Sequence, residues 1–481
     1  MDGNGQSRRR FIGSALATAG AVAAGAGWSS AMAGDQVAWA ERKPSRDDYD
    51  AIVVGAGFAG LVAARDLSKA GLNVLLLEAR NRIGGRTFTS AYHGKKIELG
   101  GTWIHWSQPH VWAEMTRYGL GIEESPGASP DRASWLTGGR LKNGSADKVW
   151  PMLAEGMAKF CDVDGQGGRL VLPLAHDPLA RRDLLLKWDQ VSLQGRLDQL
   201  SISREAKDVL APQLAINCHN DPRKAGMADM LRWWALGDYD MGRMFDKLGR
   251  YKVREGMSRL AERILADSTA AISLSTPVKA IDQQGSRYTV RTASGRTFAT
   301  NALVMAVPLN VLGSIALLDA MAEEKRVMTG PGHTGNGVKC YIHIKQKIGK
   351  WMGMAPFPNP ITLVWTEKEM DDGTLLVCFG PPGLLDVNDE AAVQDALRRL
   401  LPKAEVLGVT AYQWDVDPYA KGTWCWYRPG QLTQGLEVLR KPSGGIFMAG
   451  SDSALGWRGF VDGALESGIT AARDVRQYLK G

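Results

Sequence analysis

The sequence predicts a protein of the α/β class, in which parallel strands alternate with helices around a nucleotide-binding turn. Residues 51–54 and 73–77 are expected strands, because residues 51–54 and 74–77 are short apolar runs of the kind that forms buried parallel strands. Between them, the run Gly55-Ala-Gly-Phe-Ala-Gly60 opens a helical stretch, and the second apolar run ends at Glu78. A strand, a glycine-rich turn, a helix and an acidic residue after the next strand predict a Rossmann-like dinucleotide-binding unit.

The residues of this motif have separate physical roles. Gly55 permits the tight turn, Gly57 lets backbone N–H groups approach a pyrophosphate, and Gly60 lets the helix pack closely on the strand. The phosphates then lie at the positive end of the helix. Glu78 can accept hydrogen bonds from both ribose hydroxyl groups and would repel a 2′-phosphate, so the motif argues against NADP.

Length and composition indicate a globular protein of two or three domains. The chain has 481 residues, of which 44% are hydrophobic and 23% charged, and it shows no low-complexity tract or internal repeat. It contains 16 Trp residues, some of which could form the walls of a ligand cavity, although core packing accounts for most. No run of Lys and Arg follows residue 33, so nucleic acid is not an expected partner.

The N-terminal residues 1–33 predict an export signal. The run Ser7-Arg-Arg-Arg-Phe-Ile12 resembles a twin-arginine motif, and Ala31-Met-Ala33 is a small-residue cleavage site. The Gly- and Ala-rich stretch between them is a poor membrane span, so no stable membrane insertion is expected. The twin-arginine route exports folded proteins, which suits a protein that takes up its cofactor in the cytoplasm. A periplasmic location follows as the expectation.

The five cysteines show no pattern that predicts a disulfide framework or a metal site. Their number is odd, and neither a CxxC motif nor a Cys/His ligand spacing is present. We therefore expect no bound metal.

Blocks beyond the nucleotide-binding motif carry a resemblance to a known family. They lie at residues 84–87 (Gly-Gly-Arg-Thr), 98–103, 275–278, 304–308, 447–452 and 456–464. In these blocks the chain resembles the flavin-containing amine oxidase family, which includes the monoamine oxidases, over nearly all of residues 48–478. Residues 101–120 look most like the bacterial branch of nicotine oxidoreductases and pseudooxynicotine amine oxidases.

This resemblance implies a Rossmann-like FAD-binding domain (GR2-type) with an inserted α+β substrate-binding domain. The FAD-binding domain would be built from residues 46–110, 246–320 and 421–481, and the substrate-binding domain from residues 111–245 and 321–420. The expected cofactor-binding residues are Gly55, Gly57, Phe58, Ala59, Gly60, Glu78, Ala79, Arg80, Gly84, Gly85, Arg86, Thr87, Gly101, Thr102, Trp103, Val278, Ser451, Asp452 and Val461.

The chemistry that the resemblance implies is oxidation of an amine by hydride transfer to flavin N5, giving an imine that hydrolyses. Trp424 and Phe460 match the two walls of the family's aromatic cage, which would face each other beside the flavin. Phe460 departs from the Tyr or Asn that is more usual there, and so removes a polar contact to the substrate. Lys339 matches the lysine that holds a water near N5.

Further expectations concern the flavin itself. Asp452 is expected to accept hydrogen bonds from the ribityl chain, and the N-terminus of the last helix, near Val461, to stabilise the reduced flavin. Some relatives attach FAD to a cysteine, but Gly422 or Thr423 takes that position here. Cys425 is only nearby, so FAD is expected to be non-covalent.

Three histidines, His105, His110 and His219, have no partner at a spacing that supports acid–base catalysis, and they are interpreted as structural. Two alternative functions stay open at this point. L-amino-acid oxidation would need a cavity arginine such as Arg232 or Arg458 to hold a carboxylate. A flavin-binding desaturase or a non-catalytic relative would not need the aromatic cage. Also open are the electron acceptor, O2 or a periplasmic cytochrome c, and the oligomeric state, for which a homodimer is one candidate.

Overall fold

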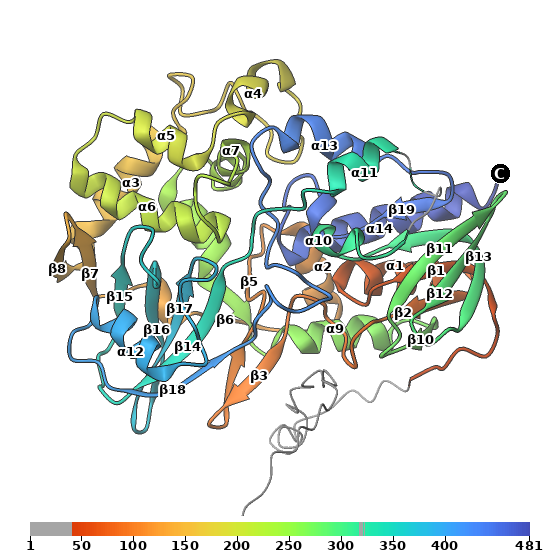
Figure 1. Ribbon diagram of the computed structural model, residues 1–481, viewed down its shortest axis with the longest axis horizontal. Helices are drawn as coiled ribbons and strands as arrows, with labels where there is room; N and C mark the ends of the chain where they lie inside the picture. Colours follow the sequence, from red (N-terminus) through yellow and green to blue (C-terminus); the bar gives the residue numbers. More distant parts are fainter. Residues whose placement is uncertain (1–40, 317–320, 322) are drawn as a thin grey trace, which may run out of the picture. The chain divides into compact units, whose positions relative to one another are not determined.

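The computed structural model describes residues 41–316, 321 and 323–481 (Figure 1). The expected export signal, residues 1–33, lies outside these described residues. The last part of one expected segment of the FAD-binding domain, residues 317–320, also lies outside them.

The first sheet contains the predicted nucleotide-binding unit. Its strands are β1 Asp48–Val54, β2 Val74–Leu77, β10 Ala271–Ser273, β11 Val278–Gln284, β12 Arg287–Thr292, β13 Thr297–Met305 and β19 Ile446–Met448. The order is β10-β2-β1-β13-β12-β11, with β19 also beside β13. β1 pairs in parallel with β2 on one side and with β13 on the other, and helix α1 (Phe58–Lys69) connects β1 to β2. The predicted strand–turn–helix–strand unit is therefore confirmed.

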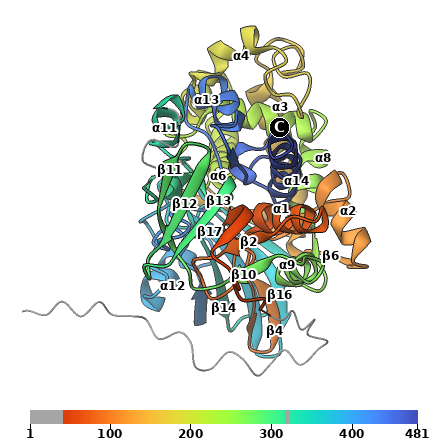
Figure 2. The same cartoon turned by 90° about the vertical axis from the view of Figure 1, so that its right-hand side faces the viewer.

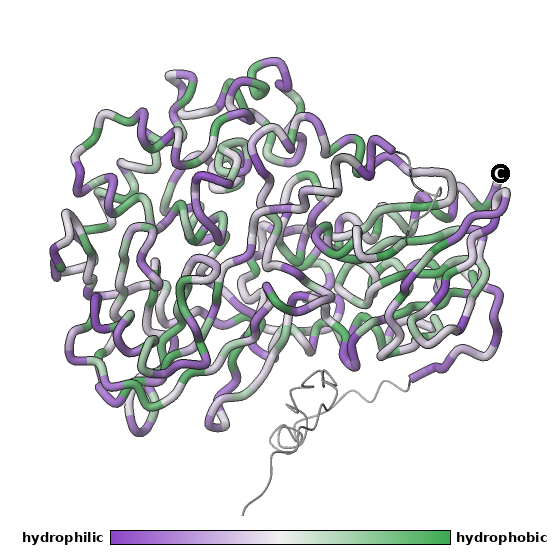
Figure 3. Tube along the Cα trace, in the orientation of Figure 1, coloured by the Kyte–Doolittle hydropathy of each residue, from purple (hydrophilic) through white to green (hydrophobic). Residues whose placement is uncertain are grey.

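Both faces of this sheet are buried. Ala51 and Val53 of β1 pack on the side of α1 and the C-terminal helix α14 (Val461–Tyr478), whereas Ile52 and Val54 pack on the side of the β11–β12 ribbon. Figure 2 shows α1 and α14 next to each other, in agreement with their many contacts. Burial on both faces explains why residues 51–54 of β1 and all of β2 are uninterrupted apolar runs, coloured as hydrophobic in Figure 3.

The second sheet is mostly antiparallel. Its strands are β7 Arg132–Thr137, β8 Arg140–Ser145, β14 Val338–Ile344, β15 Trp351–Met354, β16 Leu363–Met370, β17 Gly373–Gly380 and β18 Val406–Ala411, in the order β18-β14-β17-β16-β15-β7-β8. Along β14, Cys340 and Ile342 face a core closed by α12 (Glu390–Arg398). Tyr341, between them, faces the opposite side, where the other large core lies.

Shorter strands and helices complete the fold. They are β3 Thr89–Tyr92, β4 Lys95–Glu98, β5 Trp103–Ile104, β6 Ile122–Glu124, β9 Tyr251–Val253, α2 Pro109–Arg117, α3 Ala146–Cys161, α4 Arg182–Asp189, α5 Leu193–Gln199, α6 Arg204–Cys218, α7 Met227–Leu236, α8 Met241–Phe245, α9 Met257–Ala266, α10 Leu309–Leu312, α11 Glu323–Thr329 and α13 Gln431–Arg440. Within the described ranges, no helix combines the length and the apolar character needed to cross a membrane.

The domain boundaries expected from the sequence stay a prediction. The strands of the first sheet come from residues 48–77, 271–305 and 446–448, and those of the second sheet from residues 132–145 and 338–411. Residues 181–219, between strands of the two sheets, contain α4, α5 and α6. Lys339 lies on β14.

Candidate functional site

One large cavity of about 930 Å³ extends from the nucleotide-binding turn of the first sheet to the second sheet, where it meets the face that carries Lys339, Trp365 and Phe379. Its lining includes most of the predicted site residues: Gly55, Gly57, Phe58, Ala59, Glu78, Ala79, Arg80, Gly84, Gly85, Arg86, Thr87, Gly101, Thr102, Trp103, Val278, Lys339, Trp424, Ser451, Phe460 and Val461. A cavity of this size lies at the upper end of the range for ligand-binding sites.

The glycine turn has the conformation that its sequence predicted. Gly55 has a φ of +102°, and a Cβ atom there would lie 2.7 Å from the backbone oxygen of Ala306. A Cβ atom on Gly60 would lie 1.9 Å from the oxygen of Gly55, so this glycine lets α1 pack against the turn, and it does not line the cavity itself. Gly57, in contrast, faces open space, where a Cβ atom would meet only Gly85 at 3.8 Å. No side chain caps the N-terminus of α1, and its first residues line the cavity.

Glu78 is held rigidly at the carboxyl end of β2. Its Oε2 accepts a hydrogen bond of 2.7 Å from the backbone N–H of Ala56, and its Oε1 accepts one of 2.8 Å from the backbone N–H of Arg80. The side chain is buried and lines the cavity. Each carboxylate oxygen keeps a second lone pair, so the group can still accept hydrogen bonds from a ligand.

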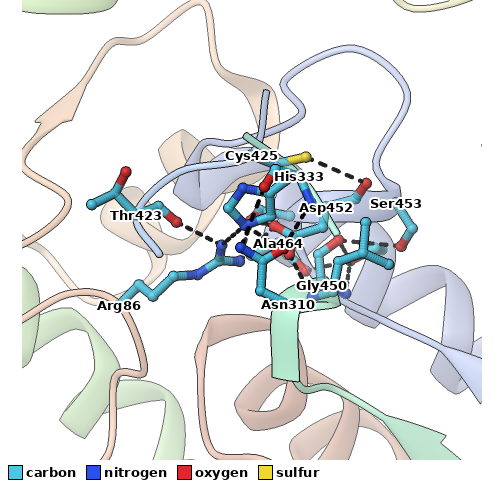
Figure 4. A network of polar contacts seen from close by, with 12 residues as sticks. Arg86, Asn310, His333, Thr423, Cys425, Gly450, Asp452, Ser453 and Ala464 are labelled. Atoms are coloured by element: carbon cyan, nitrogen blue, oxygen red, sulfur yellow. Dashed lines mark hydrogen bonds and ion pairs between the residues drawn. The ribbon is translucent and has the colours of Figure 1, made fainter. Parts of the chain in front are cut away.

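Arg86 and Asp452 form the centre of a buried polar network (Figure 4). Arg86 Nη2 lies 2.6 Å from Asp452 Oδ1, and Arg86 Nη1 donates a 2.7 Å hydrogen bond to the backbone oxygen of Thr423. Asp452 Oδ2 accepts from the backbone N–H of Leu309 at 2.9 Å. Burial raises the pKa of Asp452, but Arg86, His333 and these hydrogen bonds outweigh burial and lower the pKa to about 2.

Asp452 does not itself line the cavity. The structure places it behind Arg86, Ser451 and Gly450, which do, and its two oxygens are already engaged. The expected contact between this carboxylate and a ribityl chain stays a prediction. The observed partners of Asp452 show that it also holds Arg86 in place.

The N-terminus of α14 opens into the cavity. Val461 begins the helix, no side chain caps it, and Phe460, Val461 and Ala464 all line the cavity. Phe460 packs against Trp233 and Trp457, with ring centroids 5.2 and 5.4 Å away. The uncapped N–H groups and the helix dipole favour negative charge at this point.

Trp424 forms a second aromatic wall and is fixed from behind. Its ring is parallel to that of His219, at a centroid distance of 4.1 Å and an interplanar angle of 3°. Its indole N–H donates a 2.8 Å hydrogen bond to the backbone oxygen of Asn217. Phe379 meets it edge-on, 6.4 Å away. The ring of Trp424 thus has contacts that set both its position and its tilt.

His219 also lines the cavity, a role that the sequence did not indicate. Its Nδ1 lies 2.8 Å from Thr423 Oγ1 and its Nε2 lies 3.1 Å from the backbone oxygen of Val338. Burial lowers the pKa of His219 to about 3, so the ring is neutral near pH 7. It is a structural histidine, as predicted, but one that positions a cavity wall. Trp233, Trp365 and Phe379 are further wall residues that carried no motif. The high Trp content pointed to the two tryptophans, and nothing in the sequence pointed to Phe379.

Lys339 extends from β14 to the loop after β4. Its Nζ donates hydrogen bonds to the backbone oxygens of Glu98 and Gly100, at 2.6 and 2.9 Å, and to Thr102 Oγ1 at 2.6 Å. These three bonds use all three N–H groups of an ammonium ion. Burial lowers the pKa of Lys339, and Glu98 partly opposes this effect. The geometry shows that Lys339 holds the loop that lines the cavity. A protonated Lys339 then has no free N–H group to donate to the expected water.

The other candidate residues lie away from the cavity. Arg232 and Arg458 are fully buried and both pair with Asp229. His105 contacts Asp246, and His110 contacts Asp462 at the start of α2. None of these residues lines the cavity, and no cysteine in the described part of the chain does so.

Comparison with known proteins gives consistent results. Residues 58–476 match the family model described as flavin containing amine oxidoreductase. The chain is 44% identical to pseudooxynicotine dehydrogenase from Pseudomonas sp., over 99% of this chain and 97% of the relative. It is 35% identical to nicotine dehydrogenase from Pseudomonas putida, over 99% and 98% of the two chains.

Solved structures show the same fold. A triple mutant of putrescine oxidase superposes with a TM-score of 0.76 at 24% identity, covering 89% of this chain and 99% of that one. Cyclohexylamine oxidase from Brevibacterium oxydans superposes with a TM-score of 0.74 at 20% identity, covering 90% and 100%. The predicted α/β fold, the FAD cofactor and FAD-dependent amine oxidation are thereby confirmed. The chain is an enzyme and belongs to the flavin containing amine oxidoreductase family.

Proposed function

We propose that the enzyme oxidises a secondary or aryl-alkyl amine of the nicotine type, with pseudooxynicotine as the first candidate. The observation that carries this proposal is the aromatic and apolar character of the cavity end between Trp424 and Phe460. Trp103, Trp233 and Trp365 also line it. The relatives quoted above are named for pseudooxynicotine and nicotine, and this supports an alkyl amine that carries an aromatic ring as substrate.

The residues present fit FAD. Open space beside Gly57 and the uncapped start of α1 suit the pyrophosphate, and Glu78 suits the ribose. The uncapped start of α14 suits the electron-rich edge of the ring system. When bound, FAD supplies the hydride acceptor for the carbon next to the amine nitrogen.

The chain's own side chains then bind and orient the substrate. Trp424 and Phe460 present apolar surfaces that exclude water and restrict the orientation of the amine. The only carboxylates among the described lining residues are Glu78, at the nucleotide end, and Asp147, which is exposed. No buried carboxylate is therefore available there to pair with an ammonium group, so the aromatic end favours the neutral amine.

Amino acids fit this cavity poorly. A substrate carboxylate would need an unpaired arginine, but each described arginine in the lining has an acidic partner: Arg80 has Asp417, Arg86 has Asp452 and Arg250 has Glu124. The geometry thus favours amine oxidation over the L-amino-acid alternative.

We also propose that FAD is held without a covalent bond to cysteine. The thiol of Cys425 is fully buried, its Sγ lies 3.9 Å from the backbone oxygen of Asp452, and it does not line the cavity. Release of intact FAD on acid denaturation would support this. A flavin that stays on the protein would oppose it.

The expected export to the periplasm is likewise a proposal. It rests on the motif at residues 7–12 and the cleavage site at residues 31–33. Arg8→Lys together with Arg9→Lys should retain the protein in the cytoplasm. Equal periplasmic amounts of variant and wild type would contradict this proposal.

For the electron acceptor, we propose a periplasmic cytochrome c rather than O2, because both relatives quoted above are named dehydrogenases. Reoxidation of the reduced enzyme should be faster with cytochrome c than with O2.

A homodimer is the proposed oligomeric state, to be checked by light scattering.

The experiment for the substrate is turnover with an electron-accepting dye, which removes dependence on the natural acceptor. Pseudooxynicotine, nicotine, putrescine and an L-amino acid should be compared, with products identified by mass spectrometry. We expect the highest kcat/KM with one of the two pyridine-containing amines. A preference for putrescine or for the amino acid would overturn the proposed substrate class.

A further inference from the structure

One face of β14, which carries Lys339, Tyr341 and His343, runs along the hairpin formed by β3 and β4. Lys339 at one end bonds to the backbone oxygen of Glu98, and Tyr341, two residues on, donates a 2.9 Å hydrogen bond to the same oxygen. His343 is the next residue on this face and meets the tip of the hairpin. Its ring lies edge-on to those of Tyr92 and His93, with centroids 5.8 and 5.7 Å away.

His343 is a buried polar group without an ordinary partner. Its side chain is 0% exposed, and neither ring nitrogen forms a hydrogen bond within the described part of the chain. Nε2 lies 3.1 Å from Asp372 Oδ1, close enough for an ion pair but not oriented as a hydrogen bond. Buried imidazole nitrogens in a stable fold normally have a partner, so this arrangement needs an explanation.

Two turns bring further ligand atoms to His343. His93 occupies the turn between β3 and β4, where its positive φ of 46° is followed by Gly94 with a φ of 72°. Asp372 lies in the turn between β16 and β17. One nitrogen of each histidine and a carboxylate oxygen of Asp372 all lie within 4.8 Å of one another.

We propose that His93, His343 and Asp372 bind a divalent transition metal ion such as Zn²⁺. Imidazole nitrogens and a carboxylate are the ligands that Zn²⁺ accepts, and tetrahedral coordination separates neighbouring ligand atoms by about 3.3 Å. Small rotations of the exposed His93 and Asp372 side chains would bring the three groups to that spacing. A water molecule would complete the coordination. Imidazole ligands also disfavour Mg²⁺ and Ca²⁺, which prefer oxygen.

This site is separate from the cavity, because none of its three residues lines it. It would nevertheless act on the cavity wall. β3 follows Arg86 and Thr87 along the chain, and β4 leads into Gly101 and Thr102, so both stems of the hairpin continue into residues that line the cavity. A metal ion that ties the hairpin tip to β14 and to the β16–β17 turn should stabilise this region.

The test is titration of the untagged, chelator-treated holoenzyme with Zn²⁺ by calorimetry, with Mg²⁺ as the comparison ion. His93→Ala and Asp372→Asn remove exposed ligands, so they should leave the fold intact, whereas a change at the buried His343 could disturb the sheet. His176→Ala is the matched control, because His176 is exposed and lies outside the cluster. Melting temperature with and without Zn²⁺ provides a second readout.

We expect one Zn²⁺ per chain, no comparable binding of Mg²⁺, and a rise in the melting temperature of the wild type. Each ligand variant should weaken Zn²⁺ binding by roughly 10-fold or more and lose the thermal shift, while His176→Ala should behave as the wild type. Absence of saturable Zn²⁺ binding to the wild type would overturn the proposal. Unchanged binding in both ligand variants would overturn it equally.

Discussion

The rings of His219 and Trp424 are stacked, with their planes 3° apart and their centroids 4.1 Å apart. His219 is in turn fixed by Thr423 Oγ1 and by the backbone oxygen of Val338. It therefore acts as a positioning residue: it sets the plane of one cavity wall without needing to contact the reacting atoms.

Replacement His219→Gln should impair turnover through Trp424. Gln keeps polar groups near Thr423 but removes the flat surface behind the indole, so we expect kcat to fall by about 10-fold, which corresponds to about 1.4 kcal/mol in the barrier. FAD content should stay unchanged. Steady-state kinetics with a dye acceptor, together with the flavin-to-protein ratio, would check this. A change confined to flavin content would contradict the positioning role.

Replacement Trp424→Ala should have a larger effect on the same kinetics. Loss of the wall lets the amine take several orientations, and we expect kcat/KM to fall by about 100-fold. Trp106→Ala provides the control, because Trp106 is 46% exposed and does not line the cavity. Equal activities of the two variants would show that the indole of Trp424 does not orient the substrate.

Replacement Arg86→Met should destabilise the enzyme by leaving the charge of Asp452 buried without its main partner. Breaking such a pair costs about 3–5 kcal/mol. Urea unfolding of the holoenzyme would measure this change in the free energy of unfolding. Arg287→Met is a suitable control: its ion pair with Asp48 is exposed and should contribute less than about 1 kcal/mol. Similar losses of unfolding free energy in both variants would show that the pair of Arg86 and Asp452 contributes no more to stability than an exposed ion pair.

The pH dependence of stability should show the buried, neutral state of His219. Burial lowers its pKa to about 3, whereas its ordinary value is 6.5. Below pH 6.5 the unfolded chain binds a proton at this residue and the folded chain does not, so His219 destabilises the fold as pH falls toward 3.

At pH 5 this effect amounts to about 2 kcal/mol, and at pH 7.5 it is close to zero. The loss of stability caused by His219→Gln should therefore be about 2 kcal/mol smaller at pH 5 than at pH 7.5. Urea unfolding at the two pH values would measure the difference. A loss that is the same at both would indicate that His219 titrates normally in the folded protein.

The nucleotide half of the site could be predicted well from the sequence. Gly55, Gly57, Gly60 and Glu78 act locally, within one strand–turn–helix–strand unit, so their spacing along the chain reflects their geometry. Even Gly60, which does not line the cavity, has the close-packing role that its position predicted.

The substrate half depends on contacts between distant segments and was harder to predict. His219 stacks on Trp424 across more than 200 residues of sequence, and nothing in the spacing of either residue indicates this. The ion pair between Arg86 and Asp452 likewise joins segments far apart in the sequence, and no spacing indicated it. The cluster of His93, His343 and Asp372 also comes from three separate elements, so the sequence shows no ligand spacing that indicates it.

The central claim is that the aromatic cavity accepts a neutral amine, which is then oxidised. Its most direct test is anaerobic mixing of the holoenzyme with pseudooxynicotine, following loss of the visible flavin absorption over a range of pH. We expect rapid bleaching whose rate constant, at a fixed subsaturating total amine concentration, increases with pH as the free amine replaces its ammonium form. A rate that is highest where the amine is fully protonated, or no bleaching with any amine tested, would contradict the account.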